Sequence, residues 1–495
     1  MASGPVRTAQ AGVSRDEVAA RLDAALAARP ADFNAICQLG AAAQRLGLAG
    51  HAARALAKTS QFIVDMCRSG NAELALQAEN AVYHAFVRSH EIEEHYESAF
   101  SLWREPMAAL GRSRAAVPAR PATRTIGFVL PSGVVLGHTE VLFRLLEARD
   151  AAVDARIYVF GGCNADFLQR ARKLAVTVVA YPESRTGGTP AGYLPRLEWL
   201  RDCMRQDGVA TAVWVSTPVI ATFAFAMRIA PVQVFWTLRY HPVRLPEIDG
   251  YITYGSWNES ERVFHGQAWS VCPVPLALDP RLPAPADVAA LRARFPEKCL
   301  LGTLAREEKI HSADFLASVV EILRRHPECG YAWTGQSRHA GIDEAFRAGG
   351  VHERCHFVGW VDTPLYAAAL DLFLETFPLG CGITGYQALA AGVPLLSFAL
   401  PNTVFGMQYW RELMDKAGTP ANLTREMLDA YPVLSARDGA EYAALASRLV
   451  ADAAFREEWK ARESRFFAEE IAGIARYSRR FFDTLAAVAA KALQS

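Results

Sequence analysis

A glycine-rich stretch at residues 377–394 contains the residue types of an anion-binding turn. Three of its glycines let the backbone approach a ligand closely, and a threonine among them adds a hydroxyl. A turn of this kind that opens onto a helix directs free N–H groups and the positive end of the helix dipole at one place. We therefore expect a phosphate group to bind here; glycines kept only for packing are the alternative. The candidate contact residues are Gly380, Gly382, Thr384 and Gly385.

Two cations and an amide follow apolar runs earlier in the chain. Arg306 and Lys309 come just after the run 300–304, where they could neutralise a diphosphate. Gln336 follows the run 330–334, from which its amide could reach a nucleotide base. The alternatives are solvent-exposed loop charges and an ordinary polar turn.

Two histidines occupy similar positions in the first half of the chain. His138 follows the expected strand 126–130, just before a helix that is predicted to start near residue 139. His241 follows the expected strand 232–237. A neutral imidazole that titrates near physiological pH can accept a proton from an acceptor hydroxyl or orient an amide. For His138 the alternative is a histidine that caps the helix or fills a turn.

The chain lacks the motifs of several other chemistries. It has no Walker loop, no GxSxG nucleophile elbow, no HExxH zinc motif and no Asp-x-Asp pair. A metal-held diphosphate is therefore not expected. Lys309, Arg306 and the helix dipole would neutralise the diphosphate instead, so we expect no metal and no other cofactor.

The bulk properties limit the possible functions. With 495 residues the chain is too long for one ordinary core, and its formal net charge of zero argues against a nucleic-acid partner. The nine cysteines form no CxxC pair, which is typical of reduced thiols in a cytoplasmic protein. The uncharged stretch 208–227 is long enough to span a membrane, but Pro218 interrupts it. We expect a buried strand at 211–215 and a buried helix at 219–229 there, and no membrane insertion.

Shifts in composition divide the chain into three parts. Residues 1–112 show apolar positions at three- and four-residue spacing, which predicts an all-helical domain with one loose tetratricopeptide-like (TPR-like) repeat near 39–55. Short apolar runs alternate with helical patterns over 124–275 and again over 286–495, which predicts two parallel sheets covered on both faces. The helical stretch 440–491 is expected to close the third part and to cross back to the second. Such units, facing across a cleft, place ligand sites at the carboxyl ends of their strands.

From about residue 125 onward the chain resembles a GT-B glycosyltransferase. It is most similar to glycosyltransferase family 41, which contains the nucleocytoplasmic O-GlcNAc transferases and the bacterial cytoplasmic N-glycosyltransferases. The resemblance implies an α/β protein with the GT-B fold, in which two Rossmann-like doubly wound domains face each other, here preceded by an all-α N-terminal domain. The motifs that carry it, by their order and spacing, are 306–310, 334–337, 377–380 and 384–394, and 228–233 with 241–242 resembles the bacterial branch.

The resemblance also implies roles for individual residues. Lys309 would neutralise the donor diphosphate, and Gln336 would contact the uracil. The family usually has an acidic residue at the position of Gln387 to hold the ribose hydroxyls, and a glutamine hydrogen-bonds them less strongly. The predicted catalytic residues are His138 and Lys309, the acceptor-side residues are His138 and His241, and the donor-binding residues are Arg306, Lys309, Gln336, Gly380, Gly382, Thr384, Gly385 and Gln387.

The residues together with the resemblance predict a cytoplasmic, metal-independent hexosyltransferase, and the resemblance implies that it acts with inversion. It would move glucose or a GlcNAc-like hexose from a UDP-sugar to an Asn or Ser/Thr side chain of a protein, such as an adhesin- or flagellin-like acceptor. One alternative is the same fold with a glycan or small-molecule acceptor. The other is a catalytically silent scaffold whose helical domain binds partners, which the glutamine at position 387 would favour.

Overall fold

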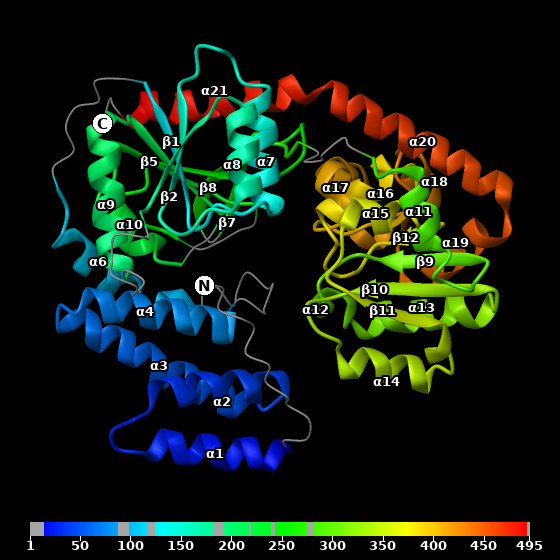
Figure 1. Ribbon diagram of the computed structural model, residues 1–495, viewed down its shortest axis with the longest axis horizontal. Helices are drawn as coiled ribbons and strands as arrows, with labels where there is room; N and C mark the ends of the chain where they lie inside the picture. The colour runs from blue at the N-terminus through cyan, green and yellow to red at the C-terminus, as the bar shows by residue number, and fades with distance from the viewer. Residues whose placement is uncertain are drawn as a thin grey trace.

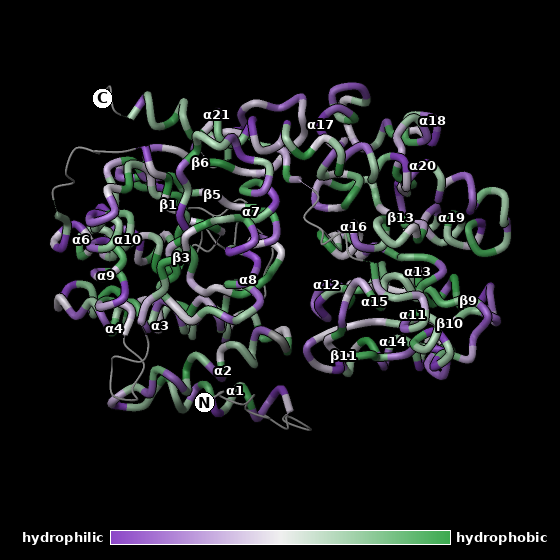
Figure 2. The backbone as a smooth tube through the Cα atoms, turned by 45° about the horizontal axis from the view of Figure 1, so that its top comes forward, coloured by the Kyte–Doolittle hydropathy of each residue, from purple (hydrophilic) through white to green (hydrophobic). Residues whose placement is uncertain are grey.

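The computed structural model of the protein describes residues 14–87, 99–116, 124–182, 192–216, 219–238, 243–264, 266–275 and 282–492. It consists of a helical region and two α/β units, which two long C-terminal helices join along one side (Figure 1). Hydrophobic and hydrophilic residues alternate along the helices (Figure 2), and the buried hydrophobic residues of helices and strands gather in the cores around the two sheets. Each unit is thus built around its own sheet.

The helices of the N-terminal region begin at capping side chains. Ser14, Asp32 and Asn71 each accept a hydrogen bond from the backbone N–H three residues further on, which satisfies a free donor of the first turn. The described helices are α1 (Arg15–Ala27), α2 (Phe33–Arg45), α3 (Ala49–Arg68), α4 (Ala72–Val82), the π-helix η1 (Tyr83–Val87) and α6 (Arg104–Arg112).

The first sheet has the strand order β3-β2-β1-β4-β5-β6-β8-β7, and all its pairs are parallel except β7 with β8. Buried β-branched and aromatic residues fill its central strands, as a sheet covered on both faces requires. The strands are β1 (Ile126–Leu130), β2 (Ala155–Val159), β3 (Thr177–Ala180), β4 (Thr211–Val215), β5 (Val232–Trp236), β6 (Gly250–Thr253), β7 (Glu261–Phe264) and β8 (Gln267–Val271). The helices are α7 (Gly137–Glu147), α8 (Ala165–Lys173), α9 (Tyr193–Gln206) and α10 (Ala221–Ala226).

Two carboxylates of α4 attach the helical region to this first unit. Glu73 accepts hydrogen bonds from the N–H groups of Tyr193 (3.0 Å) and Leu194 (2.9 Å) at the start of α9. Glu79 is fully buried and accepts from the N–H of Ile220 (3.0 Å) at the start of α10. The helical region therefore caps two helices of the neighbouring unit.

One hydrophobic core continues from the helical region into the first unit. Trp103 and Met107 of the helical region belong to the same buried cluster as Trp214 and Phe235 of the sheet. At Gly111 an added Cβ would lie 2.7 Å from the Cβ of Ala226 in α10, so α6 and α10 pack closely. The helices and the sheet consequently depend on each other for burial.

The second sheet is entirely parallel, with the order β11-β10-β9-β12-β13-β14. Its strands are β9 (Cys299–Thr303), β10 (Cys329–Thr334), β11 (Cys355–Gly359), β12 (Leu372–Leu374), β13 (Leu395–Phe398) and β14 (Ser435–Ala436). Its helices are α11 (Pro285–Arg292), α12 (Glu307–Ile310), α13 (Ala313–Arg325), α14 (Ala340–Ala348), α15 (Thr363–Ala368), α16 (Ile383–Ala390), α17 (Val404–Ala417), α18 (Arg425–Asp429) and α19 (Gly439–Ala451), with the 3₁₀-helices η3 (His352–Arg354) and η4 (Pro420–Asn422).

The C-terminal helices connect the two units. Trp459 of α20 (Ala453–Ala472) belongs to a core of the second unit, whereas Tyr477 and Phe481 of α21 (Ile474–Ala492) belong to a core of the first. Figure 1 shows α21 lying over the first sheet after α20 has covered the flank of the second. The predicted crossing back to the first unit is confirmed.

The α/β class, the two parallel-rich sheets and the helical N-terminal region are also as predicted from the sequence. The helix expected at 219–229 is shorter, because Ile220 and Arg228 have left-handed backbone angles (φ 55° and 60°) on either side of α10. None of the described helices is both long and apolar enough to cross a membrane.

Candidate functional site

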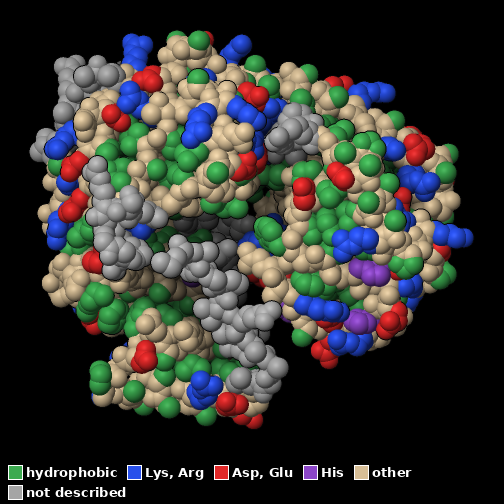
Figure 3. All heavy atoms as spheres, viewed as in Figure 1, with side chains coloured by type: hydrophobic (Ala, Val, Ile, Leu, Met, Phe, Trp, Pro, Cys, Tyr) green, Lys and Arg blue, Asp and Glu red, His purple; other side chains and the backbone are tan. Residues whose placement is uncertain are grey.

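A cleft of about 640 Å³ lies between the two α/β units, at the carboxyl ends of both sheets. From the first unit it is lined by residues that follow β1, β4, β5 and β6, and from the second by residues that follow β9 to β13. The molecule is hollowed between its two halves in Figure 3, where positive and negative side chains are interspersed over the surrounding surface. Predicted site residues that line the cleft are His138, Arg306, Lys309, Gln336, Gly380, Gly382 and Thr384.

The glycine-rich turn lies on the second-unit side of the cleft and opens onto α16. Gly382 is the N-cap of α16 and has φ 71° and ψ −130°, a conformation that favours glycine. At Gly380 an added Cβ would lie 2.3 Å from the carbonyl oxygen of Asn402, so a side chain has no room. Within the described residues the N–H groups of Ile383 and Thr384 donate no hydrogen bond, and both residues line the cleft. The turn therefore presents free donors at a helix N-terminus.

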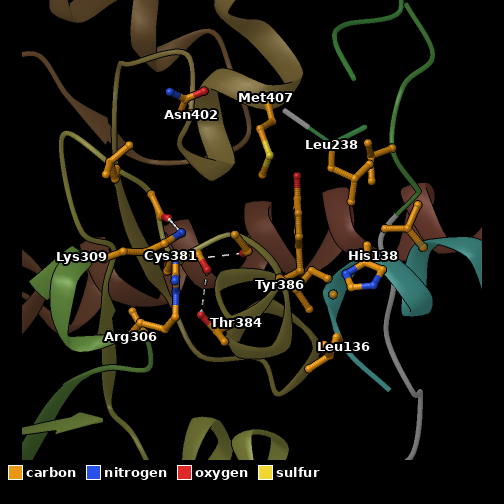
Figure 4. Close-up of a pocket in the computed structure, with 18 of the residues that line it drawn as sticks. Leu136, His138, Leu238, Arg306, Lys309, Cys381, Thr384, Tyr386, Asn402 and Met407 are labelled. Carbon is orange, nitrogen blue, oxygen red and sulfur yellow. Dashed lines mark hydrogen bonds between the residues drawn. The ribbon is translucent and has the colours of Figure 1, made fainter. Parts of the chain in front are cut away.

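Lys309 is held against this turn. Its Nζ donates a hydrogen bond to the carbonyl oxygen of Gly380 (2.7 Å), which places an ammonium group beside the N-terminus of α16. Arg306 also lines the cleft, immediately before α12. Figure 4 shows Arg306, Lys309 and Thr384 on one side of the cleft and Leu136, His138 and Leu238 on the other. Two cations and a helix N-terminus thus converge at one end of the site.

The hydroxyl of Thr384 already donates a hydrogen bond within the protein. It donates a hydrogen bond to the carbonyl oxygen of Leu304, which ties the start of α16 to the loop after β9. A phosphate oxygen can only accept hydrogen bonds, so it would have to displace Leu304 to receive one from this hydroxyl. The backbone N–H of Thr384 can contact an anion without such a change.

A buried carboxylate supports the loop that carries Gln336. Glu307 accepts hydrogen bonds from the N–H of Gln336 (2.9 Å) and from the hydroxyl of Ser337 (3.3 Å). The Gln336 side chain is exposed at the cleft, as a contact with a nucleotide base would require. The sequence indicated the amide but not the carboxylate that positions its backbone.

His138 lies on the first-unit wall, in the first turn of α7. The cap of this helix is formed by other residues, because the hydroxyl of Thr139 accepts the N–H of Leu136 (2.6 Å). His138 makes no hydrogen bond with another described residue, and burial lowers its pKa to about 4. The expectation that it titrates near physiological pH is therefore wrong for this unliganded state: the imidazole is neutral and a weak proton acceptor.

Three predicted site residues are not found in the cleft lining. Gly385 is buried, and an added Cβ would lie 2.7 Å from a methyl carbon of Val404, so it serves close packing. Gln387 does not line the cleft, and its Oε1 is buried without a hydrogen-bond partner in the described chain. His241 lies outside the described residues.

The structure adds cleft residues that are not among the predicted site residues. The Tyr254 hydroxyl of the first unit donates a hydrogen bond to Asn402 Oδ1 of the second (2.6 Å), which bridges the two walls. Tyr386 of α16 and Met407 of α17 also line the cleft, and Trp360, 67% exposed, follows β11 at its edge. Single aromatic, amide or methionine side chains, whether in loops or on helices, carry no pattern that indicates a ligand site.

No cluster of three or more potential metal ligands occurs among the described residues. The metal independence expected from the sequence stays a prediction.

Solved structures of low sequence identity share this fold. A mutant of the Thermobaculum terrenum O-GlcNAc transferase matches with a TM-score of 0.58 and 18% identity, over 97% of this chain and 95% of that chain. Anabaena Alr3699/HepE in complex with UDP and glucose matches with a TM-score of 0.51 and 13% identity, over 74% of this chain and 100% of that chain. The complex of the same Anabaena protein with UDP-glucose matches with a TM-score of 0.50 and 14% identity, over 73% of this chain and 100% of that chain. No protein-family model and no curated protein sequence matches the chain. The chain therefore has the fold of the GT-B glycosyltransferases, with a helical region ahead of its two facing α/β units.

Proposed function

We propose that the protein is a glycosyltransferase that moves a hexose from a UDP-sugar to a protein side chain, without a metal ion and with inversion at the sugar carbon. The observation that carries the proposal is the position of Lys309 beside the free N–H groups of Ile383 and Thr384 in the cleft. The shared fold with structures described as containing UDP or UDP-glucose supports a UDP-sugar as the donor.

The second unit would stabilise the leaving group. As the bond to the sugar breaks, negative charge develops on the departing diphosphate, and fixed positive groups lower the energy of that state. Lys309, Arg306 and the N-terminus of α16 are such groups. Gln336 would hydrogen-bond the uracil at the same edge of the sheet.

The first unit would position the acceptor. His138 faces the donor side across the cleft, and its neutral imidazole can accept a hydrogen bond from the acceptor group. A bound diphosphate favours the protonated imidazole, so the pKa of His138 rises in the complex and its basicity increases. We assign it acceptor orientation and, in the loaded enzyme, proton acceptance.

We place the reaction in the cytoplasm, since all nine cysteines are free thiols. A protein acceptor, such as an adhesin- or flagellin-like protein, is proposed because the helical region is packed against the acceptor-side unit and adds surface beside it.

The test is to incubate the purified protein with a panel of UDP- and GDP-sugars and to measure nucleotide release, first alone and then with cell extract and a labelled sugar. Release from a UDP-hexose with label in protein is expected. If the label appears only in glycans or small molecules, the acceptor is one of these and not a protein. If the protein neither binds nor releases a nucleotide, it is a catalytically silent scaffold.

A further inference from the structure

A buried glutamate lies directly behind the glycine-rich turn. Glu375 follows β12, and none of its surface is exposed. Its carboxylate accepts the N–H of Val404 at the start of α17 (2.9 and 3.0 Å), the hydroxyl of Ser397 on β13 and, more weakly, the thiol of Cys381 (3.4 Å). One carboxylate thus joins a strand, a helix start and the turn of the donor site.

The same carboxylate is close to the atoms that would meet the diphosphate. An added Cβ at Gly380 would lie 2.6 Å from Glu375 Oε1, so the turn packs on the carboxylate itself. Lys309 donates to the carbonyl oxygen of that same glycine (2.7 Å). Glu375 and a bound diphosphate would therefore compete for the positive charge of Lys309.

Glu375 differs from its titratable neighbours in the pH range in which it changes charge. Burial raises its pKa to about 7, against the opposing effects of its hydrogen bonds and of Lys309. Facing it are Cys381 of the turn, Tyr386 of α16 and Tyr442 of α19, whose pKa values burial raises above their usual ranges. These groups stay protonated between pH 7 and 8. His138, whose pKa is about 4 before the ligand binds, stays largely neutral at pH 8 even when a bound diphosphate raises that pKa, so the charge change there falls on the glutamate.

We propose that Glu375 is the positioning residue of the donor site and takes up a proton from solvent when a nucleoside diphosphate binds at the turn of residues 380–384. The inference rests on the proposed function. The reason is electrostatic: the ligand brings negative charge to a poorly solvated carboxylate and draws on the cation that stabilises it. The protonated carboxyl keeps Oε1 as an acceptor for the N–H of Val404 and the thiol of Cys381, and the O–H on Oε2 can donate to the hydroxyl oxygen of Ser397, so the turn remains attached to α17.

The experiment is calorimetric titration of the full-length protein with UDP-glucose at pH 8, in two buffers that differ in ionisation enthalpy. The diphosphate of this probe is a diester and keeps its charge over this pH range, so proton uptake reports the protein. With a pKa of about 7, Glu375 is about nine-tenths ionised at pH 8 in the free protein. We expect uptake of up to about 0.9 proton per ligand bound at pH 8, and an affinity that falls by at most about tenfold per pH unit above pH 7.

Two glutamine variants distinguish a specific role of Glu375 in the donor site from the general effect of replacing a buried glutamate. Glu375→Gln mimics the protonated carboxyl, so it should abolish the uptake, match wild-type affinity near pH 6 and bind severalfold more tightly than wild type at pH 9. The matched control is Glu463→Gln, which changes another fully buried glutamate with a raised pKa (about 8). Its carboxylate accepts from the N–H groups of Leu395 and Leu434 and does not line the cleft, so the uptake should persist.

The outcomes distinguish this inference from the proposed function. Binding of UDP-glucose without proton uptake in the wild type, or with uptake unchanged in Glu375→Gln, overturns the inference alone. Affinity weakened equally at every pH in Glu375→Gln shows a merely structural residue and overturns it as well. Failure of the wild type to bind any nucleotide sugar in the panel overturns the proposed function, and this inference with it.

Discussion

Replacing Lys309 is expected to lower activity strongly through the donor side of the cleft while doing little damage to the fold. Lys309→Gln removes the charge but keeps a group that can donate a hydrogen bond to the carbonyl oxygen of Gly380, 2.7 Å from Nζ in the wild type. The change also removes a cation close to Glu375, which raises the pKa of that carboxyl further. The carboxyl then becomes neutral, so the site is not left with an unpaired buried charge.

The magnitude follows from the role of the ammonium group. A fixed charge that stabilises a leaving diphosphate in a site shielded from water contributes about 2–4 kcal/mol to the transition state. At about 1.4 kcal/mol per factor of ten, kcat/KM should fall about 30- to 1000-fold. Lys309→Ala should lose at least as much, because it removes the hydrogen bond as well.

The assay is the rate of UDP release from the preferred UDP-sugar, with the melting temperature of each variant. Lys416→Gln is the matched control, since Lys416 lies in the same unit but its ion pair with Glu412 (2.6 Å) is solvent-exposed, and such pairs contribute little. Near-parental kcat/KM in a folded Lys309→Gln protein would show that Lys309 is only a loop charge and would refute the reasoning.

Four further results are expected. His138→Ala should lower transfer about 10²–10⁴-fold with nearly unchanged UDP affinity, and intact transfer with a lowered melting temperature would make this histidine structural. EDTA should not inhibit, since cationic side chains and a helix dipole neutralise the donor; strict dependence on Mg²⁺ or Mn²⁺ would contradict this. Tyr254→Phe removes the hydrogen bond to Asn402 across the cleft and should lower the free energy of unfolding by about 1 kcal/mol; an unchanged melting temperature would show that the bridge is incidental. Deleting residues 1–112 should give insoluble or partly unfolded protein, because their core continues into the first sheet; a soluble fragment with a sharp melting transition would disprove that dependence.

Local sequence patterns were sufficient for much of the donor side. A buried run followed by glycines and a helix places Gly380, Gly382 and Thr384 at the end of a parallel strand, and the same reasoning applies to Lys309 and Gln336. Because the carboxyl ends of parallel strands share one edge of a sheet, these residues had to meet, and the structure places all of them in one cleft.

What the sequence could not show depends on contacts between distant segments. Glu375 has its partners on β13, α17 and the turn, and the Tyr254–Asn402 hydrogen bond joins residues of two units. The low pKa of His138 results from burial after the units pack together. The orientation of Gln387 depends on the rotation of α16 against its neighbours, which a single helix pattern does not specify.

A UDP-sugar in the cleft should lie with its diphosphate between Lys309 and the start of α16. A crystal structure of the protein with UDP-glucose would show whether it does. Phosphate oxygens are expected within hydrogen-bond distance of Lys309 Nζ and of the N–H groups of Ile383 and Thr384, with the uracil beside Gln336. A nucleotide bound elsewhere, or an empty cleft at saturating UDP-glucose, would contradict this placement.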